Sequence, residues 1–302
     1  MGATNFGRRA FLKGIAAFGG AAALNPYLVY FAEAATVNAA RARGGSPYQN
    51  TSKAIAALGG MARFVKKGQK VAIVPNIGWA RTEEYAANTN PQVVRCLVDL
   101  CKKAGASQID VFCNPCNDIR VCYEKSGIEK ALSGSAARLQ YLSGDSYVLV
   151  PAVRGVKALT GGTDVYKLAR NADVLINVPI LKHHGLAGLT ICMKNLMGVI
   201  KKRGELHSRI HDALPDLAMM IPSHLCVVDA TRILKRNGPT GGSLDDVERK
   251  DTVIACVNIV EADALGAQLF GTAPSSFGFI AEANRRGMGE INPKNIAVKD
   301  VA

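Results

Sequence analysis

The chain has few aromatic residues and fewer acidic residues than basic ones. Only 6% of its 302 residues are Phe, Trp or Tyr, and 37 Lys and Arg outnumber 24 Asp and Glu, giving a formal net charge of +13. The basic residues are spread along the sequence, with short clusters at 201–203 and 235–236. A nucleic-acid-binding surface would gather them in one stripe with interleaved aromatic residues. We therefore expect no nucleic-acid partner, and a small anionic ligand matches these clusters better.

Several other features are missing from the sequence. It contains no internal repeat, no low-complexity tract and no Walker or GxGxxG motif for phosphate binding. Beyond its first residues, no apolar run approaches the ~20 residues that a membrane-spanning helix needs. With 48% hydrophobic residues and only eight cysteines, the chain is neither a disordered tail nor a disulfide-dense miniprotein. Its length fits one large domain or two small ones.

Residues 1–34 resemble a twin-arginine (Tat) signal peptide. Arg8 and Arg9 precede Phe-Leu-Lys, a mildly apolar stretch at 14–24 and an Ala-x-Ala site that ends at Ala34. The resemblance implies export by the Tat translocon to a periplasmic or other extracytoplasmic location. It leaves open whether the signal is cleaved or stays as an anchor. No membrane span is expected in the mature chain, and Tat cargo often carries a cofactor inserted before export.

Short apolar runs alternate with amphipathic segments from residue 70 onward. Residues 35–69 are rich in Ala, Gly and Ser and predict an irregular lead-in with one short helix at 52–58. Strands are predicted at 70–75, 108–112, 147–151, 173–179, 225–229 and 252–257, and helices at 90–105, 118–132, 164–170, 187–200 and 262–270. The alternation predicts an α/β domain over 70–302, with a mostly parallel sheet covered by helices on both faces. A division into two sub-domains near 150–165 is compatible with the pattern.

A cysteine cluster follows the predicted strand at 108–112. Cys113 and Cys116 form a Cys-x-x-Cys pair, and Cys122 lies six residues later. Such a pair can share a metal ion, an iron–sulfur cluster or a redox disulfide. A cluster usually takes four thiolates and Cys122 supplies only a third, so these alternatives and free thiols stay open. The cysteines at 96, 101, 226 and 256 lie in apolar runs and are expected in the core.

Four of the five histidines are concentrated in one segment, at 183, 184, 207 and 211. The strand at 173–179 is expected to deliver Lys182, His183 and His184 to the edge of the sheet where α/β proteins bind ligands. His207 and His211 are four residues apart, a spacing that would place two metal ligands on one helical face. Nickel and zinc are the candidate ions for this cluster.

Three further positions complete the predicted site. Gly188 allows a ligand to approach the backbone closely, and Lys194 and Asn195 lie on the predicted helix at 187–200. Asp229 ends a predicted strand, where it could orient a histidine or bind a cation. Lys182, His183, Gly188, Lys194 and Asn195 are thus predicted to bind a cofactor, and His184, Lys194 and Asp229 to act in catalysis.

Several of these motifs closely resemble the domain of unknown function (DUF) 362 family. They are Asn90–Arg95, Ala104–Ala106, Tyr123–Ile128, Leu175–Pro179, Lys194–Gly198, Val228–Ala230 and Asn237–Gly242. The resemblance covers roughly residues 65–300 and attaches no general activity to the chain. Some members of the family carry an additional ferredoxin-like cluster domain, which this sequence lacks, and many look like exported Tat proteins.

A fainter resemblance connects the segment to lactate racemases that use a nickel-pincer nucleotide. It implies that His184 is an acid/base group, that Lys194 carries the cofactor and that His207 or His211 binds nickel. The sequence departs from that family before Lys194, where Ile-Cys-Met replaces Gly-Gly-Arg, and it has no histidine before residue 183. The chain therefore lacks a counterpart of the second acid/base histidine that the racemases use.

Three functions follow from these observations. The first is an exported metal- or cofactor-dependent enzyme that acts on a small anionic substrate through the His/Lys segment. The second is an iron–sulfur or redox accessory protein for electron transfer, with Cys113, Cys116 and Cys122 as ligands. The third is a non-catalytic protein that binds a small anion. The first is the function that we expect.

Overall fold

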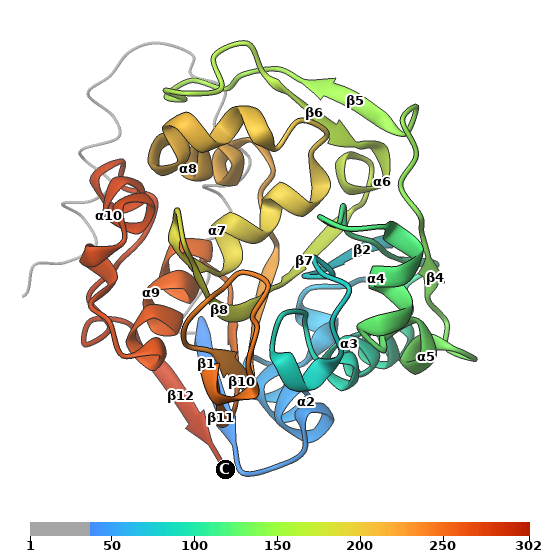
Figure 1. The fold of residues 1–302 in the computed structure, drawn as a ribbon. Helices are drawn as coiled ribbons and strands as arrows, with labels where there is room; N and C mark the ends of the chain where they lie inside the picture. Colours follow the sequence, from blue (N-terminus) through green and yellow to red (C-terminus); the bar gives the residue numbers. More distant parts are fainter. Residues whose placement is uncertain (1–36) are drawn as a thin grey trace, which may run out of the picture. The chain divides into compact units, whose positions relative to one another are not determined.

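A mixed, mostly parallel β-sheet crosses the centre of the protein (Figure 1). The structure is a computed structural model that describes residues 37–302, so the expected signal at 1–34 lies outside the described residues. The strand order is β12 (Val298–Val301), β1 (Ala39–Arg43), β11 (Val247–Cys256), β10 (Leu225–Leu234), β7 (Val174–Val178), β2 (Lys70–Pro75), β3 (Gln108–Val111) and β4 (Arg138–Leu139). Strand β8 (Ile180–His184) also pairs with β10, in parallel, and forms a hairpin with β9 (Gly188–Thr190).

Helices cover both faces of this sheet, as the alternation in the sequence predicts. One face packs against α2 (Pro47–Ala57), α3 (Pro91–Lys103), α4 (Ile119–Lys125) and α5 (Ile128–Leu132). The other packs against α6 (Lys167–Arg170), α7 (Cys192–Asn195), α8 (Ile210–Met220), α9 (Ile259–Phe270) and α10 (Gly278–Arg285). Strand β2 shows the division, because Val71 and Ile73 lie in the first core and Ala72 and Val74 in the second. The predicted fold class is confirmed.

Local signals place several of these elements where the sequence predicts them. The Asn90 side chain accepts a hydrogen bond from the backbone of Gln92 and caps α3, whose first residue is Pro91. The chain leaves α3 through Gly105, which has a φ of 92°. The remaining short elements are the 3-10 helices η2 (Met61–Arg63), η3 (Glu83–Tyr85), η4 (Leu196–Val199), η5 (Gly204–Arg209), η6 (Leu244–Asp246) and η7 (Pro274–Ser276).

The lead-in expected at 35–69 is not irregular in its described part, although most of the helix predicted at 52–58 is present as the end of α2. Strand β1 pairs with both β11 and β12, and a capping box formed by Ser46 and Gln49 starts α2. The strand was missed because its sequence, Ala-Ala-Arg-Ala-Arg, has no large apolar residue. The fold therefore begins before residue 70, and residues 37–302 belong to one compact unit without a division near 150–165.

Two of the predicted helices contain strands instead. The segment 164–170 begins with β6 (Thr163–Tyr166), which pairs with β5 (Tyr147–Val150) in a separate small antiparallel sheet. The segment 187–200 forms β9, then α7 and η4. Short apolar runs do not distinguish a buried strand from a buried helix, so periodicity alone could not decide either case. Within residues 37–302, no helix is long and apolar enough to cross a membrane.

The loop that follows β5 is held by a buried carboxylate on α8. Asp216 accepts hydrogen bonds from the backbone amides of Lys157, Ala158 and Leu159, and from the Arg286 guanidinium at 2.5 Å. Burial alone would raise the pKa of Asp216. The hydrogen bond from Arg286 and the three amides outweigh burial, so that the pKa lies below its ordinary value.

We expect Asp216→Ala to lower the free energy of unfolding by about 3 kcal/mol, because it leaves three backbone amides unpaired and removes the most buried of the three carboxylates that pair with the Arg286 guanidinium. The control Asp212→Ala removes a more exposed partner of Arg286 and should cost about 1 kcal/mol or less. Since the folded pKa of Asp216 is depressed, its contribution is present at neutral pH and is lost as the pH falls through that value. Urea titrations at pH 7 and in acid measure this, and equal losses for both variants would contradict it.

Candidate functional site

One cavity of about 630 Å³ opens where several central strands end. Its walls come from the segments that follow β2, β3 and β10, from the β8–β9 hairpin, and from α7, η4 and η5. These are mostly the carboxyl ends of parallel strands, where open α/β sheets bind ligands. The pocket therefore brings together two predicted motifs that are far apart in the sequence. One is the cysteine cluster after β3, here called the Cys loop, of which Cys113 and Cys116 line the pocket. The other is the His/Lys segment, from which Lys182, His184, Lys194 and His207 line it.

The charges that line this pocket have one sign. Lys182, Lys194 and Arg203 reach it together with the imidazoles of His184 and His207, and none of the described residues that line it is Asp or Glu. A basic wall without carboxylates attracts anions and lowers the pKa of each lysine through the charge of its neighbours.

Lys182 is the most buried of these cations, with 1% of its surface exposed. Its ammonium donates to Asn76 Oδ1 at 3.0 Å and to the carbonyl oxygen of Ala87. Burial, with the charge of Lys194 acting in the same direction, lowers the pKa of Lys182 to about 7. Neutral oxygens thus replace the carboxylate that normally accompanies a buried lysine.

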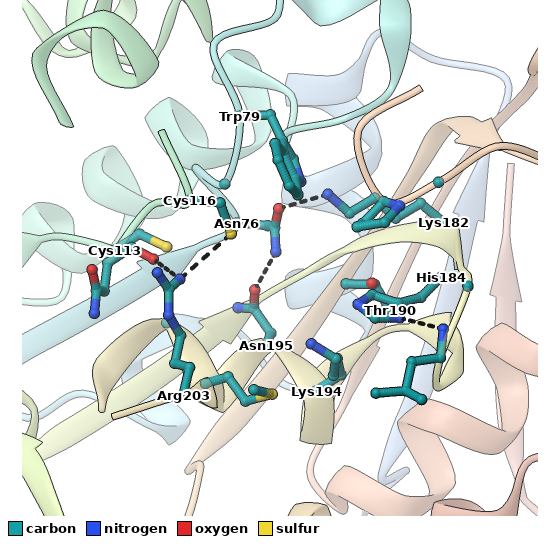
Figure 2. A pocket seen from close by; sticks show the side chains of 18 of the residues that line it. Asn76, Trp79, Cys113, Cys116, Lys182, His184, Thr190, Lys194, Asn195 and Arg203 are labelled. Atoms are coloured by element: carbon teal, nitrogen blue, oxygen red, sulfur yellow. Dashed lines mark hydrogen bonds between the residues drawn. The ribbon is translucent and has the colours of Figure 1, made fainter. Parts of the chain in front are cut away.

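A series of hydrogen-bonded amide side chains fixes the orientation of Asn76, which accepts a hydrogen bond from Lys182. Asn76 Nδ2 donates to Asn195 Oδ1, and Asn195 Nδ2 donates to Asn177 Oδ1, both at 2.9 Å (Figure 2 shows the first of these bonds). Asn177 Nδ2 in turn donates to the carbonyl of Cys192. Each amide orients the next, so Asn76 must present its oxygen to Lys182.

Lys194, on α7, differs from Lys182 in having no fixed partner. Within residues 37–302 its amine makes no hydrogen bond or ion pair, and it points into the pocket (Figure 2). Burial lowers the pKa of Lys194 to about 8, and the charge of Arg203 acts in the same direction. An unpaired amine with this pKa is unprotonated for part of the time at neutral pH, so it can act as a base or a nucleophile.

His184 is held as a neutral hydrogen-bond donor. Its Nδ1 accepts hydrogen bonds from the backbone amides of Leu186 and Ala187, which places its proton on Nε2. Burial, with the charges of Lys194 and Lys182 acting in the same direction, lowers the pKa of His184 to about 3. A neutral imidazole with this pKa is a weak base, so its chemical use here is to donate a hydrogen bond to a ligand oxygen.

Arg203 binds the Cys loop through hydrogen bonds to its backbone. Its guanidinium donates to the carbonyls of Asn114 and Pro115, each at 2.6 Å, and lies 3.7 Å from the Cys116 sulfur (Figure 2). Cys116 is exposed, whereas Cys113 is buried. Burial raises the pKa of Cys113 to about 11, so this thiol stays protonated.

Residues 71–268 match the family described as "Domain of unknown function (DUF362)". The chain belongs to this family. The DUF362 protein is 25% identical over 240 residues to the thylakoid-associated protein sll1697 of Synechocystis sp., a match that covers 76% of this chain and 72% of that protein. It also resembles the structure of the lactate racemase apoprotein from Thermoanaerobacterium thermosaccharolyticum, with 11% identity and a TM-score of 0.49. That match covers 78% of this chain and 57% of the racemase chain, less than two thirds of its length.

Two of the predicted metal ligands lie outside the pocket of the DUF362 protein. Cys122 is buried on α4 in the core beneath the first face of the sheet. His211 is on α8, where it contacts Gly278, while His207 is on the 3-10 helix η5, so they do not share one helical face. Among the described residues, no group of three His, Cys, Asp or Glu side chains is arranged to hold a metal ion. This donor set does not fit a metal bound by the protein alone.

Three other predicted residues support the pocket from outside its lining. His183 Nδ1 accepts from the backbone of Gly238, at the start of the loop that closes one side. Gly188 has a φ of 77° and packs against the Phe277 ring, where a Cβ atom would lie at 2.9 Å. The buried Asp229 accepts from the backbone of Asn90, and so anchors the start of α3.

Sequence reasoning missed several pocket residues. Asn76 and Trp79 follow β2, and Arg203 was noted only as part of a basic cluster. Thr190 carried no signal, because its place depends on which strand pairs with β8. The predicted residues that do line the pocket are Cys113, Cys116, Lys182, His184, Lys194, Asn195 and His207.

We expect Cys116 to be the one rapidly alkylated thiol of the native protein, because all eight cysteines are free and the other seven are buried. Iodoacetamide labelling followed by peptide mass spectrometry should find Cys116 modified at least about tenfold faster than any other cysteine. Cys116→Ser should remove this rapid reaction, and the control Cys122→Ser should keep it. Labelling of Cys113 or Cys122 at a comparable rate would contradict the placement of the Cys loop.

Proposed function

We propose that this DUF362 protein is an exported enzyme that takes a small anionic substrate into the basic pocket. The observation that carries the proposal is the lining itself: three cations and two imidazoles surround about 630 Å³, and the lining includes no carboxylate. Such a volume suits a small molecule, and the charge selects an anion. Trp79 and Met197 add apolar surface to the same walls.

The groups in the pocket divide into those that bind and those that react. Lys182 is immobilised by Asn76 and Ala87, which suits an anchor for a negative group. Lys194 is unpaired and has a pKa of about 8, so it supplies the base or nucleophile. His184 can donate its Nε2 proton in a hydrogen bond to an oxygen on which charge develops. No metal step is part of the proposal, since Cys122 and His211 lie elsewhere.

Anion binding can be followed by fluorescence because the single tryptophan of the chain, Trp79, lines the pocket. We expect pyruvate, oxalate or inorganic phosphate to change this fluorescence saturably, while acetone and propanamide do not. Lys182→Met should weaken the binding at least about tenfold, since it removes a buried charge partner. The matched control Lys70→Met, at the opposite end of β2, should bind like the wild type.

The same titration has a predicted pH dependence. Anions prefer the protonated amines, and the pKa values of Lys182 and Lys194 are lowered to about 7 and about 8. Affinity should therefore be highest below pH 7 and should fall as the pH rises through this range. The proposal is wrong if none of the three anions changes the fluorescence. It is also wrong if the Lys182→Met and Lys70→Met variants bind the anions with equal affinity.

The export part of the proposal is supported by the sequence of residues 1–34 and needs its own test. We expect simultaneous Arg8→Lys and Arg9→Lys substitutions to retain the protein in the cytoplasm of a host with a Tat system. The control Arg154→Lys changes an exposed arginine of the folded domain and should be exported normally. Cell fractionation distinguishes the two outcomes, and unimpaired export of the double variant would refute the signal.

A further inference from the structure

A buried hydroxyl faces the pocket without a partner. Thr190 is 3% exposed, and its Oγ1 is a buried side-chain oxygen for which the described part of the chain provides no hydrogen bond. Buried hydroxyls are normally paired, so an unpaired one in a pocket wall indicates a position where a ligand atom completes the bonding. This observation is independent of the charges around it.

The hydroxyl belongs to the residue that pairs with Lys182 in the hairpin. Lys182 and Thr190 are direct partners in the antiparallel β8–β9 hairpin, so their side chains project from the same face. Both line the pocket, and both are almost completely buried. An ammonium and a hydroxyl that come from one face of a hairpin and line the same cavity offer hydrogen bonds to two oxygens of one small anionic group, such as a carboxylate.

A second amine faces the same cavity. Lys194 lines it together with Lys182, and the charge of Lys194 lowers the pKa of Lys182. Asn76 and Ala87 hold the ammonium of Lys182, whereas Lys194 has no such partner among residues 37–302. A desolvated lysine next to another cation is the usual arrangement of an amine that attacks carbonyl carbon.

We propose that the substrate is a small carboxylate that also carries an aldehyde or ketone, and that Lys194 forms an imine with it. The substrate carboxylate occupies the Lys182–Thr190 subsite, which leaves the adjacent carbonyl carbon for the amine. This inference rests on the proposed function and names its substrate class. A phosphate ester handled with Mg²⁺ fits less well, because the lining offers no carboxylate for the ion.

The step balances without any further reactant. The lone pair of Lys194 Nζ forms the C–N bond, and the π electrons of the carbonyl move to its oxygen. The two protons of the neutral amine pass to that oxygen, water leaves, and the C=N bond forms. His184 is positioned in the same pocket with a proton on Nε2 to donate a hydrogen bond to the departing oxygen. Reversal by water restores the amine.

Trapping with borohydride tests the imine directly, with pyruvate and glyoxylate as the probes. Reduction converts the imine into a stable secondary amine, which intact-mass and peptide mass spectrometry locate. We expect one adduct per chain, on Lys194, with labelling that saturates as pyruvate increases and that oxalate suppresses. Lys194→Arg should abolish this adduct, and the control Lys70→Arg should not change it.

Thr190→Val tests the carboxylate subsite because it replaces the hydroxyl with a methyl group of similar volume. We expect several-fold more pyruvate to be needed for half-maximal labelling, with the same maximum, and Thr190→Ser should restore the wild-type concentration. A purely structural role for Thr190 would instead alter the melting temperature without shifting this concentration.

The outcomes separate this inference from the function on which it rests. If pyruvate changes the Trp79 fluorescence but no Lys194 adduct is trapped, the imine is wrong and anion binding stands. Adducts on Lys182, or adducts scattered over surface lysines without saturation, overturn the assignment to Lys194. If no anion binds at all, the basic pocket is not an anion site and both proposals fail.

Discussion

The pocket depends on a lysine buried without a carboxylate. Removing an ammonium from water is costly unless hydrogen bonds replace the lost solvent, and Lys182 receives only an amide oxygen and a backbone carbonyl. The amide chain through Asn76, Asn195 and Asn177 keeps that oxygen in place and connects it to β7. Asn195 also donates to the carbonyl of Val74 in β2. The position of the charge is therefore fixed by two central strands of the sheet.

The same sheet explains why separate sequence motifs meet in one site. Strands β2, β3 and β8 deliver their carboxyl ends to one edge, so the Cys loop after β3 and the lysines of β8 and α7 lie around one cavity. Arg203 connects the two groups through the carbonyls of Asn114 and Pro115. The cysteine and histidine motifs, which read in the sequence as alternative functions, are thus parts of one site.

The sequence predicts those elements whose local signals agree with their tertiary environment. Strand β2 and helix α3 appear where they are predicted, because an apolar run and an Asn-Pro cap each mark them. Strand β9 was read as a helix because its few apolar residues continue into α7 and η4. Its pairing with β8 depends on the tertiary structure, and the register of that pairing places Thr190 opposite Lys182.

Spacing was also a poor guide to which side chains would share the pocket. Cys122 follows Cys116 closely, but it lies on α4, whose apolar face packs into the core. His207 and His211 are four residues apart, but a change from η5 to α8 separates them. Lys182 and His184 are predicted to follow the strand at 173–179, but they lie in a further strand, β8, whose pairing with β10 and β9 brings them to the pocket.

The charges of the empty and the filled pocket follow from this arrangement. Without a ligand, burial lowers the pKa of Lys182 to about 7 and that of Lys194 to about 8. An anion beside Lys182 and Thr190 stabilises the protonated form of Lys182 and raises its pKa. The same negative charge also favours the protonated form of Lys194, in agreement with an affinity that falls as the pH rises. The charge of Lys182 offsets that of the anion, and Lys194 remains the lysine of the pocket with no fixed partner in the described structure.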